Sequence, residues 1–167
     1  SIDDIERSLT NEQLSAQAER LESQGQYAQA AEIQRRRLAL SPGDVWITYR
    51  LSRDLYSAGQ HSQADNLMRQ LASQKPGDPD QVYATGLYLS GNDRDRAALA
   101  HLNTLPRDQW NGNIQELADR LQSNQALEAA NRLRDSGKEQ EAETLLRQQQ
   151  VSTRLDSTLA DRVLQQN

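Results

Sequence analysis

The sequence predicts an all-α fold, a right-handed superhelical solenoid in which pairs of helices stack one on the next. Three landmarks recur after 34 residues, and they are Gly25 with Gly59, Ala30 with Ala64, and Pro42 with Pro76. Glycine permits the left-handed turn after a first helix, alanine lets two helices approach closely, and proline ends the second helix. The landmarks therefore mark fixed points in a helix–turn–helix unit.

Composition agrees with a stack of small repeats. The chain has 167 residues, of which 35% are hydrophobic and 4% aromatic, and it has no Phe. A single large core is hard to fill with so few large apolar side chains. A solenoid needs fewer, because each repeat contacts only its neighbours. The period of 34 residues resembles that of the tetratricopeptide repeat.

Two repeats follow directly from the landmarks, over residues 11–44 and 45–78. In each repeat the turn glycine separates two segments whose apolar residues recur at helical spacing. The apolar residues are Leu14, Ala18, Leu21, Ala30, Ile33 and Leu38 in the first repeat, and Leu51, Leu55, Ala64, Leu67 and Leu71 in the second. These faces are the expected contacts between neighbouring helices.

The third repeat, over residues 79–106, is expected to depart from the regular period. Its turn is assigned to Gly91, which follows Gly59 by only 32 residues. Pro106 cannot continue a helix, because it lacks a backbone N–H and its ring clashes with the preceding turn. The second helix of this repeat is therefore predicted to be short.

A segment longer than one repeat separates the third turn from the next. Gly137 lies 46 residues after Gly91, whereas the period is 34 residues. The surplus falls on residues 107–122, which we expect to form a joint and an extra short helix. Residues 111–113 are Asn-Gly-Asn, a turn-forming run. We therefore expect the superhelix to change direction and to flex near residues 106–113.

The extra helix has a counterpart at the start of the chain. When Gly25 is aligned with Gly137, residues 2–9 fall beside residues 114–121. Both segments carry apolar residues at helical spacing. An extra short helix is therefore expected over residues 1–10 as well.

A fourth repeat is expected over residues 123–150, with Gly137 at its turn and Ala142 at its helix crossing. A last helix over residues 151–167 has no partner helix in the sequence. Its apolar residues are Leu159, Ala160 and Val163. This open apolar face is expected to pack against a further repeat or to cause self-association.

The chain is not expected to insert into a membrane. No apolar stretch approaches the roughly 20 residues of a membrane span, and the first residues do not resemble a signal peptide. The chain begins without Met and ends on an unpaired helix, so we expect a segment of a longer protein. The absence of Cys is compatible with an oxidising or a reducing compartment.

Charge and residue types argue against nucleic-acid binding and against catalysis. The net charge is −5, whereas a nucleic-acid partner needs a concentrated basic face. The one basic run, residues 35–37, fans around a helix. His61 and His101 are the only histidines, and no group of residues has the spacing of metal ligands. We therefore expect no enzyme activity, no cofactor and no metal.

The inner face of the solenoid is the candidate binding surface. In tetratricopeptide repeats the second, fifth, ninth and twelfth positions of the first helix line the groove. In the second repeat these positions hold Trp46, Tyr49, Arg53 and Tyr56, to which we add Tyr88 of the third repeat. Aromatic rings with polar edges stack on sugar faces or on peptide side chains. Packing of Tyr56 and Tyr88 between helices is the competing interpretation.

A carboxylate clamp of the kind found in chaperone adaptors is not supported. Such clamps use Lys and Asn at the fifth and ninth positions. Here those positions hold Ser15 and Glu19, then Tyr49 and Arg53.

Several unusual runs resemble a family of bacterial outer-membrane cellulose-export proteins. They are SIDDIERSL (1–9), VWITYRLS (45–52), GLYLSG (86–91) and NIQEL (113–117), and the similarity covers essentially the whole chain. The resemblance implies an enterobacterial periplasmic segment, preceded by more repeats and followed by an outer-membrane β-barrel through which glucan leaves.

The resemblance also implies a non-catalytic scaffold that links an inner-membrane synthase to an outer-membrane export pore. Its partners would be other subunits of the cellulose synthesis and export complex. Two alternatives are a carbohydrate-binding module that contacts β-1,4-glucan or peptidoglycan, and a generic protein–protein adaptor. An adaptor requires a peptide groove, a glucan-binding module requires a row of stacked aromatic rings, and a spacer requires neither.

Overall fold

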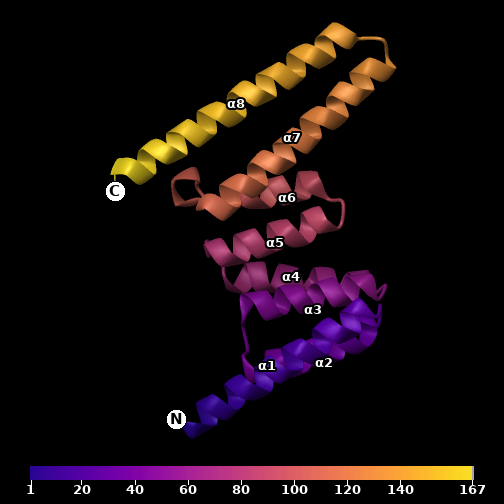
Figure 1. The fold of residues 1–167 in the computed structure, drawn as a ribbon, viewed down its shortest axis with the longest axis vertical. Coiled ribbons are helices and arrows are strands. Elements are labelled where there is room, and N and C mark those ends of the chain that lie inside the picture. Colours follow the sequence, from indigo (N-terminus) through magenta and orange to yellow (C-terminus); the bar gives the residue numbers. More distant parts are fainter. Residues whose placement is uncertain (167) are drawn as a thin grey trace.

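Antiparallel helix pairs follow one another along a single direction (Figure 1). The computed structural model describes the backbone of residues 1–166 and the side chains of residues 1–155. Within that backbone there is no strand, and the elements are α1 (Ile2–Ser23), α2 (Tyr27–Leu40), α3 (Val45–Ser57), α4 (His61–Gln74), α5 (Pro79–Gly91), α6 (Asp95–Leu102), the 3-10 turn η1 (Arg107–Gln109), α7 (Gly112–Asp135) and α8 (Glu139–Gln166).

The turns inside the repeats have the left-handed backbone that the landmark glycines predict. Gly25, Gly59 and Gly137 have φ of +74°, +88° and +79°. The assignment of Gly91 to the third turn is wrong, because Gly91 is the last residue of α5. Asp93 takes the left-handed position with φ of 60°. Aspartate is among the few residues that tolerate this conformation, so no glycine marks the turn.

The third repeat therefore keeps the 34-residue period once its turn is placed at Asp93 and not at Gly91. Asp93 lies 34 residues after Gly59, and Ala98 lies 34 residues after Ala64. Ala64 and Ala98 are both fully buried, as close helix crossings require. The departure from the period begins only after α6, which is short as Pro106 predicts.

The extra short helices over residues 1–10 and 107–122 are not separate elements. Residues 1–10 form the first part of α1, and the helical residues of 107–122 form the first half of α7. Neither α1 nor α7 has an internal Pro, and neither has a Gly beyond its first residue, so nothing ends the helix where a boundary was predicted. Two repeats thus begin with an elongated first helix.

The boundary predicted between residues 150 and 151 is also absent, because α8 runs on to Gln166. α8 pairs with α7 as the second helix of the fourth repeat (Figure 1). The side chains proposed to form an open apolar face, Leu159, Ala160 and Val163, lie outside the residues whose side chains are described.

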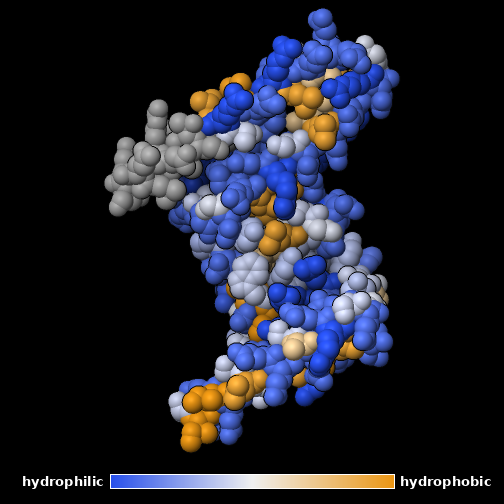
Figure 2. All heavy atoms as spheres, viewed as in Figure 1, coloured by the Kyte–Doolittle hydropathy of each residue, from blue (hydrophilic) through white to orange (hydrophobic). Residues whose placement is uncertain are grey.

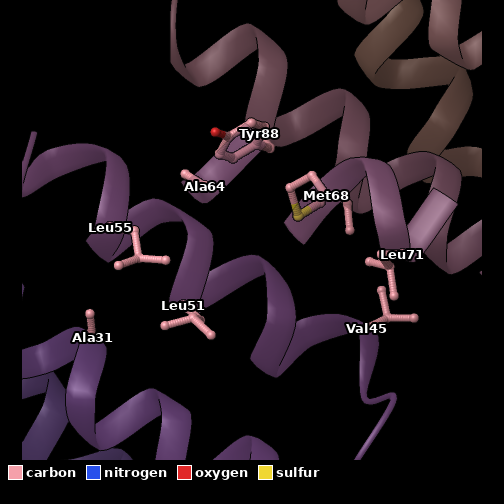
Figure 3. Close-up of a cluster of buried hydrophobic side chains, with 9 residues drawn as sticks. Ala31, Val45, Leu51, Leu55, Ala64, Met68, Leu71 and Tyr88 are labelled. Carbon is pink, nitrogen blue, oxygen red and sulfur yellow. The ribbon is translucent and has the colours of Figure 1, made fainter. Parts of the chain in front are cut away.

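One buried apolar cluster joins the first three repeats (Figure 3). It contains Ala31 of α2, Val45, Leu51 and Leu55 of α3, Ala64, Met68 and Leu71 of α4, and Ala84 and Tyr88 of α5. In Figure 3 these side chains point toward one another across the helix pairs. Burial of this shared surface holds neighbouring repeats together.

A second buried cluster attaches α7 to the third repeat. It contains Val82 of α5, Ala98 and Leu102 of α6, Leu105, and Ile114, Leu117, Ala118 and Leu121 of α7. A Cβ on Gly86 would lie 2.8 Å from Leu102 Cδ2 and 3.0 Å from Leu117 Cδ2. A larger residue at position 86 would therefore force the side chains of Leu102 and Leu117 to shift, and glycine leaves room for them between α5, α6 and α7.

The apolar residues at the start of α1 lie on the surface, unlike their counterparts in α7. Ile2, Ile5 and Leu9 are exposed, and Figure 2 shows an apolar patch at this end of the molecule. The rest of the surface in that view is mostly hydrophilic.

Candidate functional site: a groove surface on α3 and α5

The start of α3 is fixed by Asp44. Its Oδ1 accepts hydrogen bonds of 3.0 Å from the backbone N–H groups of both Trp46 and Ile47. This N-cap satisfies two of the donors that a helix start leaves unpaired. Because α3 begins at Val45, positions 46, 49 and 53 fall on one face at helical spacing.

Three aromatic rings and one guanidinium meet on this face. The ring of Trp46 lies edge-on to Tyr49, with centroids 5.8 Å apart, and edge-on to Tyr83 of α5, with centroids 5.9 Å apart. The guanidinium of Arg53 lies over the Tyr49 ring, 5.5 Å from its centroid. We call Trp46, Tyr49, Arg53 and Tyr83 the groove surface. Trp46 is 38% exposed, so part of its ring is accessible to solvent.

Tyr83 is the member of the groove surface that the sequence analysis missed. It lies 34 residues after Tyr49, at the fifth position of the third repeat. Placing the third turn at Gly91 concealed this equivalence and drew attention to Tyr88 instead. The 34-residue offset of Ala98 from Ala64 was the signal that could have revealed it.

Tyr88 does not belong to the groove surface, because it is only 2% exposed. Its hydroxyl donates a 2.7 Å hydrogen bond to Asp65 of α4, which Arg94 also contacts at 2.8 Å. The hydrogen bond from Arg94 lowers the pKa of Asp65, and burial raises the pKa of Tyr88. Tyr88 is therefore buried among α4, α5 and the turn that carries Arg94. It packs between helices, which was the alternative to a contact with a ligand.

Tyr56 is half-buried, between the groove surface and the buried site of Tyr88. Its ring stacks on His61 at a centroid distance of 3.9 Å and meets Tyr88 edge-on at 6.1 Å. These contacts fix Tyr56 against the start of α4. The five predicted groove residues therefore separate into an accessible group, Trp46, Tyr49 and Arg53, and an inner pair, Tyr56 and Tyr88.

Beside the groove surface the molecule has a hollow of about 320 Å³ between α3, α5 and α7. Its walls include Tyr49, Arg53 and Ser57 of α3, Leu87 and Ser90 of α5, and Arg120 of α7. We call it the α3–α7 hollow. Arg120 reaches it because α7 is elongated at its start, so the inserted segment extends the groove.

A buried carboxyl group lies on the other side of α3. Asp54 is 2% exposed, and Gln34 of α2, which is also buried, hydrogen-bonds to it. Desolvation, and then the nearby Glu22 of α1, raise the pKa of Asp54 to about 7. One oxygen of Asp54 and one of Glu22 have no hydrogen-bond partner. This cluster lies in the interface of the first two repeats and does not face the hollow.

Each histidine contacts a neighbouring side chain, and His61 remains exposed. Burial lowers the pKa of His101, whose Nε2 lies 2.7 Å from Gln81 Oε1. His61 stacks on Tyr56. Among the residues with described side chains, no three His, Asp or Glu gather as a metal site would require.

Comparison with known proteins bears on both the fold and the resemblance. A tetratricopeptide repeat family model matches residues 21–87. The fold is a tetratricopeptide-repeat solenoid. The chain is also 75% identical over 161 residues to "Cellulose synthase operon protein C" of Salmonella typhimurium, and 71% identical over 161 residues to the Escherichia coli K12 protein of the same name. A "Putative cellulose synthase operon protein C" of Escherichia coli O157:H7 is 72% identical over 165 residues.

These similarities cover 96% to 99% of this chain but 14% of each relative. They confirm that the unusual runs resemble those of cellulose synthase operon protein C. In the described part of the tetratricopeptide solenoid, no helix is both long enough and apolar enough to cross a membrane.

Proposed function

We propose that this chain is a non-catalytic protein-interaction segment of the bacterial cellulose secretion machinery. It works in the periplasm, where the solenoid links the inner-membrane synthase to the outer-membrane export pore. The relatives' name places those proteins with cellulose synthesis, and the tetratricopeptide fold is suited to extended binding surfaces. Its partners are other subunits of the synthesis and export complex.

The observation that carries this proposal is the groove surface. Trp46 is exposed although the chain has only two Trp residues, and Tyr49, Tyr83 and Arg53 hold it in a fixed cluster. Exposed aromatic and arginine side chains are the residues enriched at protein interfaces. A pure spacer has no need of such a cluster.

Affinity enrichment tests the proposal. The immobilised chain is incubated with detergent extracts of a cellulose-producing enterobacterium and of the same strain without its cellulose operon, and bound proteins are quantified by mass spectrometry. We expect a cellulose-synthesis protein to be enriched from the first extract and to be lost with the Trp46→Ala, Tyr83→Ala variant. A control variant, Leu127→Ala, Val151→Ala, removes two exposed apolar side chains outside the groove and should bind normally. Equal binding by both variants would contradict a role for the groove.

A second candidate function is direct contact with β-1,4-glucan or with peptidoglycan. The observation in its favour is the exposed ring of Trp46, which Tyr49 and Tyr83 contact edge-on. Titration with short β-1,4-glucans, followed by amide chemical shifts, tests it. Shifts confined to positions near 46, 49 and 83 would support sugar contact. If no resonance shifts at about 10 mM sugar, glucan binding with a dissociation constant of about 10 mM or tighter is excluded.

The generic adaptor is the remaining alternative. It predicts enrichment of proteins that are unrelated to cellulose and are captured equally from both extracts. The self-association proposed for the terminal helix is separable from all of these functions, because it predicts a concentration-dependent mass in light scattering.

A further inference from the structure

We propose that the α3–α7 hollow binds an acidic, extended segment of a partner protein, with a carboxylate held between Arg53 and Arg120. The inference deepens the proposed function, and it rests on that function for the existence of a protein partner. It assigns the partner's chemistry from the charges that line the hollow.

Charge is the first argument. The chain carries a net charge of −5, yet none of the residues that line the α3–α7 hollow is acidic, and two of them are arginines. Where the side chains are described, neither Arg53 nor Arg120 forms an ion pair. Two guanidinium groups at one hollow attract a carboxylate, and no acidic residue in the lining competes for them.

The placement of Arg53 is the second argument. Its guanidinium lies over the ring of Tyr49, which is itself fixed edge-on against Trp46. The cation–π contact with the ring leaves the N–H groups of the guanidinium available, and these are the groups that bind a carboxylate. A side chain that already favours one place beside the hollow loses less conformational entropy when it binds.

The placement of Arg120 is the third argument. Leu117 and Leu121, on either side of it in α7, are buried against α5 and α6. At Gly86 the side chain of Leu117 packs closely against the α5 backbone. Arg120 is therefore held at the hollow by packed neighbours, although its own side chain is exposed.

Size and lining favour an extended peptide. A hollow of about 320 Å³ accommodates one or two side chains. Ser57 offers a hydroxyl group to a peptide backbone, and Leu87 offers an apolar contact. The Ser90 hydroxyl donates to the Leu87 carbonyl and can still accept a hydrogen bond. A neutral glucan gains little from two guanidinium groups, so the charge of the hollow favours a carboxylate-bearing ligand.

Peptide titration provides the test. The probe is the blocked peptide acetyl-Glu-Glu-Leu-Glu-Glu-amide, whose carboxylates are all on side chains, and the reference is its Gln counterpart. Binding is followed by amide chemical shifts of the chain at low ionic strength. We expect shifts at positions 49–57, 87–92 and 120 with the Glu peptide and at least about tenfold weaker binding of the Gln peptide. Raising the ionic strength from about 0.01 M to about 0.15 M should weaken binding, since the Debye length falls from about 30 Å to about 8 Å.

Matched variants separate the hollow from general charge attraction. Arg53→Gln, Arg120→Gln should weaken binding of the Glu peptide by at least about tenfold. Arg36→Gln, Arg134→Gln removes the same charge from exposed helix positions outside the hollow, and it should change binding by less than about twofold. Equal loss in both double variants, or equal binding of the two peptides, overturns the inference.

The outcome is distinguishable from that of the proposed function. If the Arg53→Gln, Arg120→Gln variant still enriches a cellulose-synthesis protein and the Glu peptide does not bind, the inference fails and the proposed function stands. If a short β-1,4-glucan shifts the resonances of the hollow and the Glu peptide does not, the acidic-peptide assignment is overturned in favour of sugar. If the Glu peptide binds at the hollow but no cellulose-synthesis protein is enriched, the hollow is supported and the proposed function fails.

Discussion

Asp54 links the stability of the first two repeats to pH. Its pKa is raised from 3.8 to about 7 by desolvation and by the nearby Glu22. Between these values the folded state holds more protons than the unfolded state, so stability falls as pH rises. Relative to Asp54→Asn, the natural chain should lose on the order of 2 kcal/mol between about pH 5 and about pH 8.

Urea unfolding of both proteins across this range measures the difference. Carboxyl groups that do not interact with Asp54 titrate in both chains and cancel when the two curves are subtracted, whereas Glu22, which interacts with it, contributes to the difference. Parallel stability curves would show that Asp54 is ionised in the fold. Arg53 lies close enough to oppose the shift, so Arg53→Gln should raise the pKa of Asp54 further.

Ala64 of α4 is fully buried in the cluster that contains Tyr88. Ala64→Arg should lower the free energy of unfolding by about 2–4 kcal/mol, because the larger side chain overpacks the crossing or buries an unpaired charge. Thermal unfolding measures this. Ala28→Arg, at an exposed position of α2, is the control and should stay within about 0.5 kcal/mol. An unchanged midpoint for Ala64→Arg would mean that the crossing is not close-packed.

Asp93 occupies the turn position of the third repeat that glycine occupies in the other repeats. Its φ of 60° is one that glycine adopts without strain. Asp93→Gly should therefore raise stability by about 0.5–1 kcal/mol, and Gly59→Asp should lower it by a similar amount. Urea unfolding of the two variants checks this pair. Loss of stability in Asp93→Gly would indicate that the aspartate side chain stabilises the turn.

At the level of elements, sequence reasoning predicted the helix pairs well and the boundaries of the elongated helices poorly. Landmarks with a steric cause, such as Gly25 and Pro42, marked turns correctly. The extra helices were separated from α1 and α7 because a repeat length was imposed where no Gly or Pro ends a helix. Periodicity shows which residues face a neighbour, but it does not show where a continuous helix stops.

The groove was predicted in part for a related reason. Trp46, Tyr49 and Arg53 follow from their position within α3, and they do lie together. Tyr83 was missed and Tyr88 was wrongly included because both depend on the register of the third repeat. Arg120 could not be predicted, since its place at the hollow depends on how α7 packs against α5 and α6.

Trp110 holds the junction between α6 and α7. Its Nε1 donates a 2.9 Å hydrogen bond to the carbonyl of Leu105, and Arg107 lies over its ring at 4.3 Å. Trp110→Ala should cost about 2 kcal/mol, less than for a fully buried Trp, because the ring is half-buried. It should also speed hydrogen exchange in the first turns of α7. Trp46→Ala, in the groove, is the matched control and should leave exchange in α7 unchanged.

Flexing near residues 106–113 stays a prediction, and the Trp110 contacts bear on it directly. If Trp110→Ala changes neither exchange in α7 nor the scattering profile, the junction does not depend on this side chain.

On the scale of the whole molecule, the chain is a stack of helix pairs, and α7 contributes to the wall of the hollow beside the groove surface. Each pair contacts its neighbours, so the groove surface and the α3–α7 hollow are held by two buried clusters that meet at α5.

The central claim is that this groove binds a protein of the cellulose secretion machinery. Site-directed photo-crosslinking tests it most directly. A benzoylphenylalanine replaces Tyr83 in the groove or Ala28 on exposed α2, and each chain is irradiated with extract from a cellulose-producing enterobacterium. We predict that position 83 forms an adduct with a cellulose-synthesis protein identified by mass spectrometry and that position 28 does not. No such adduct from position 83, or the same adduct from both positions, would contradict the claim.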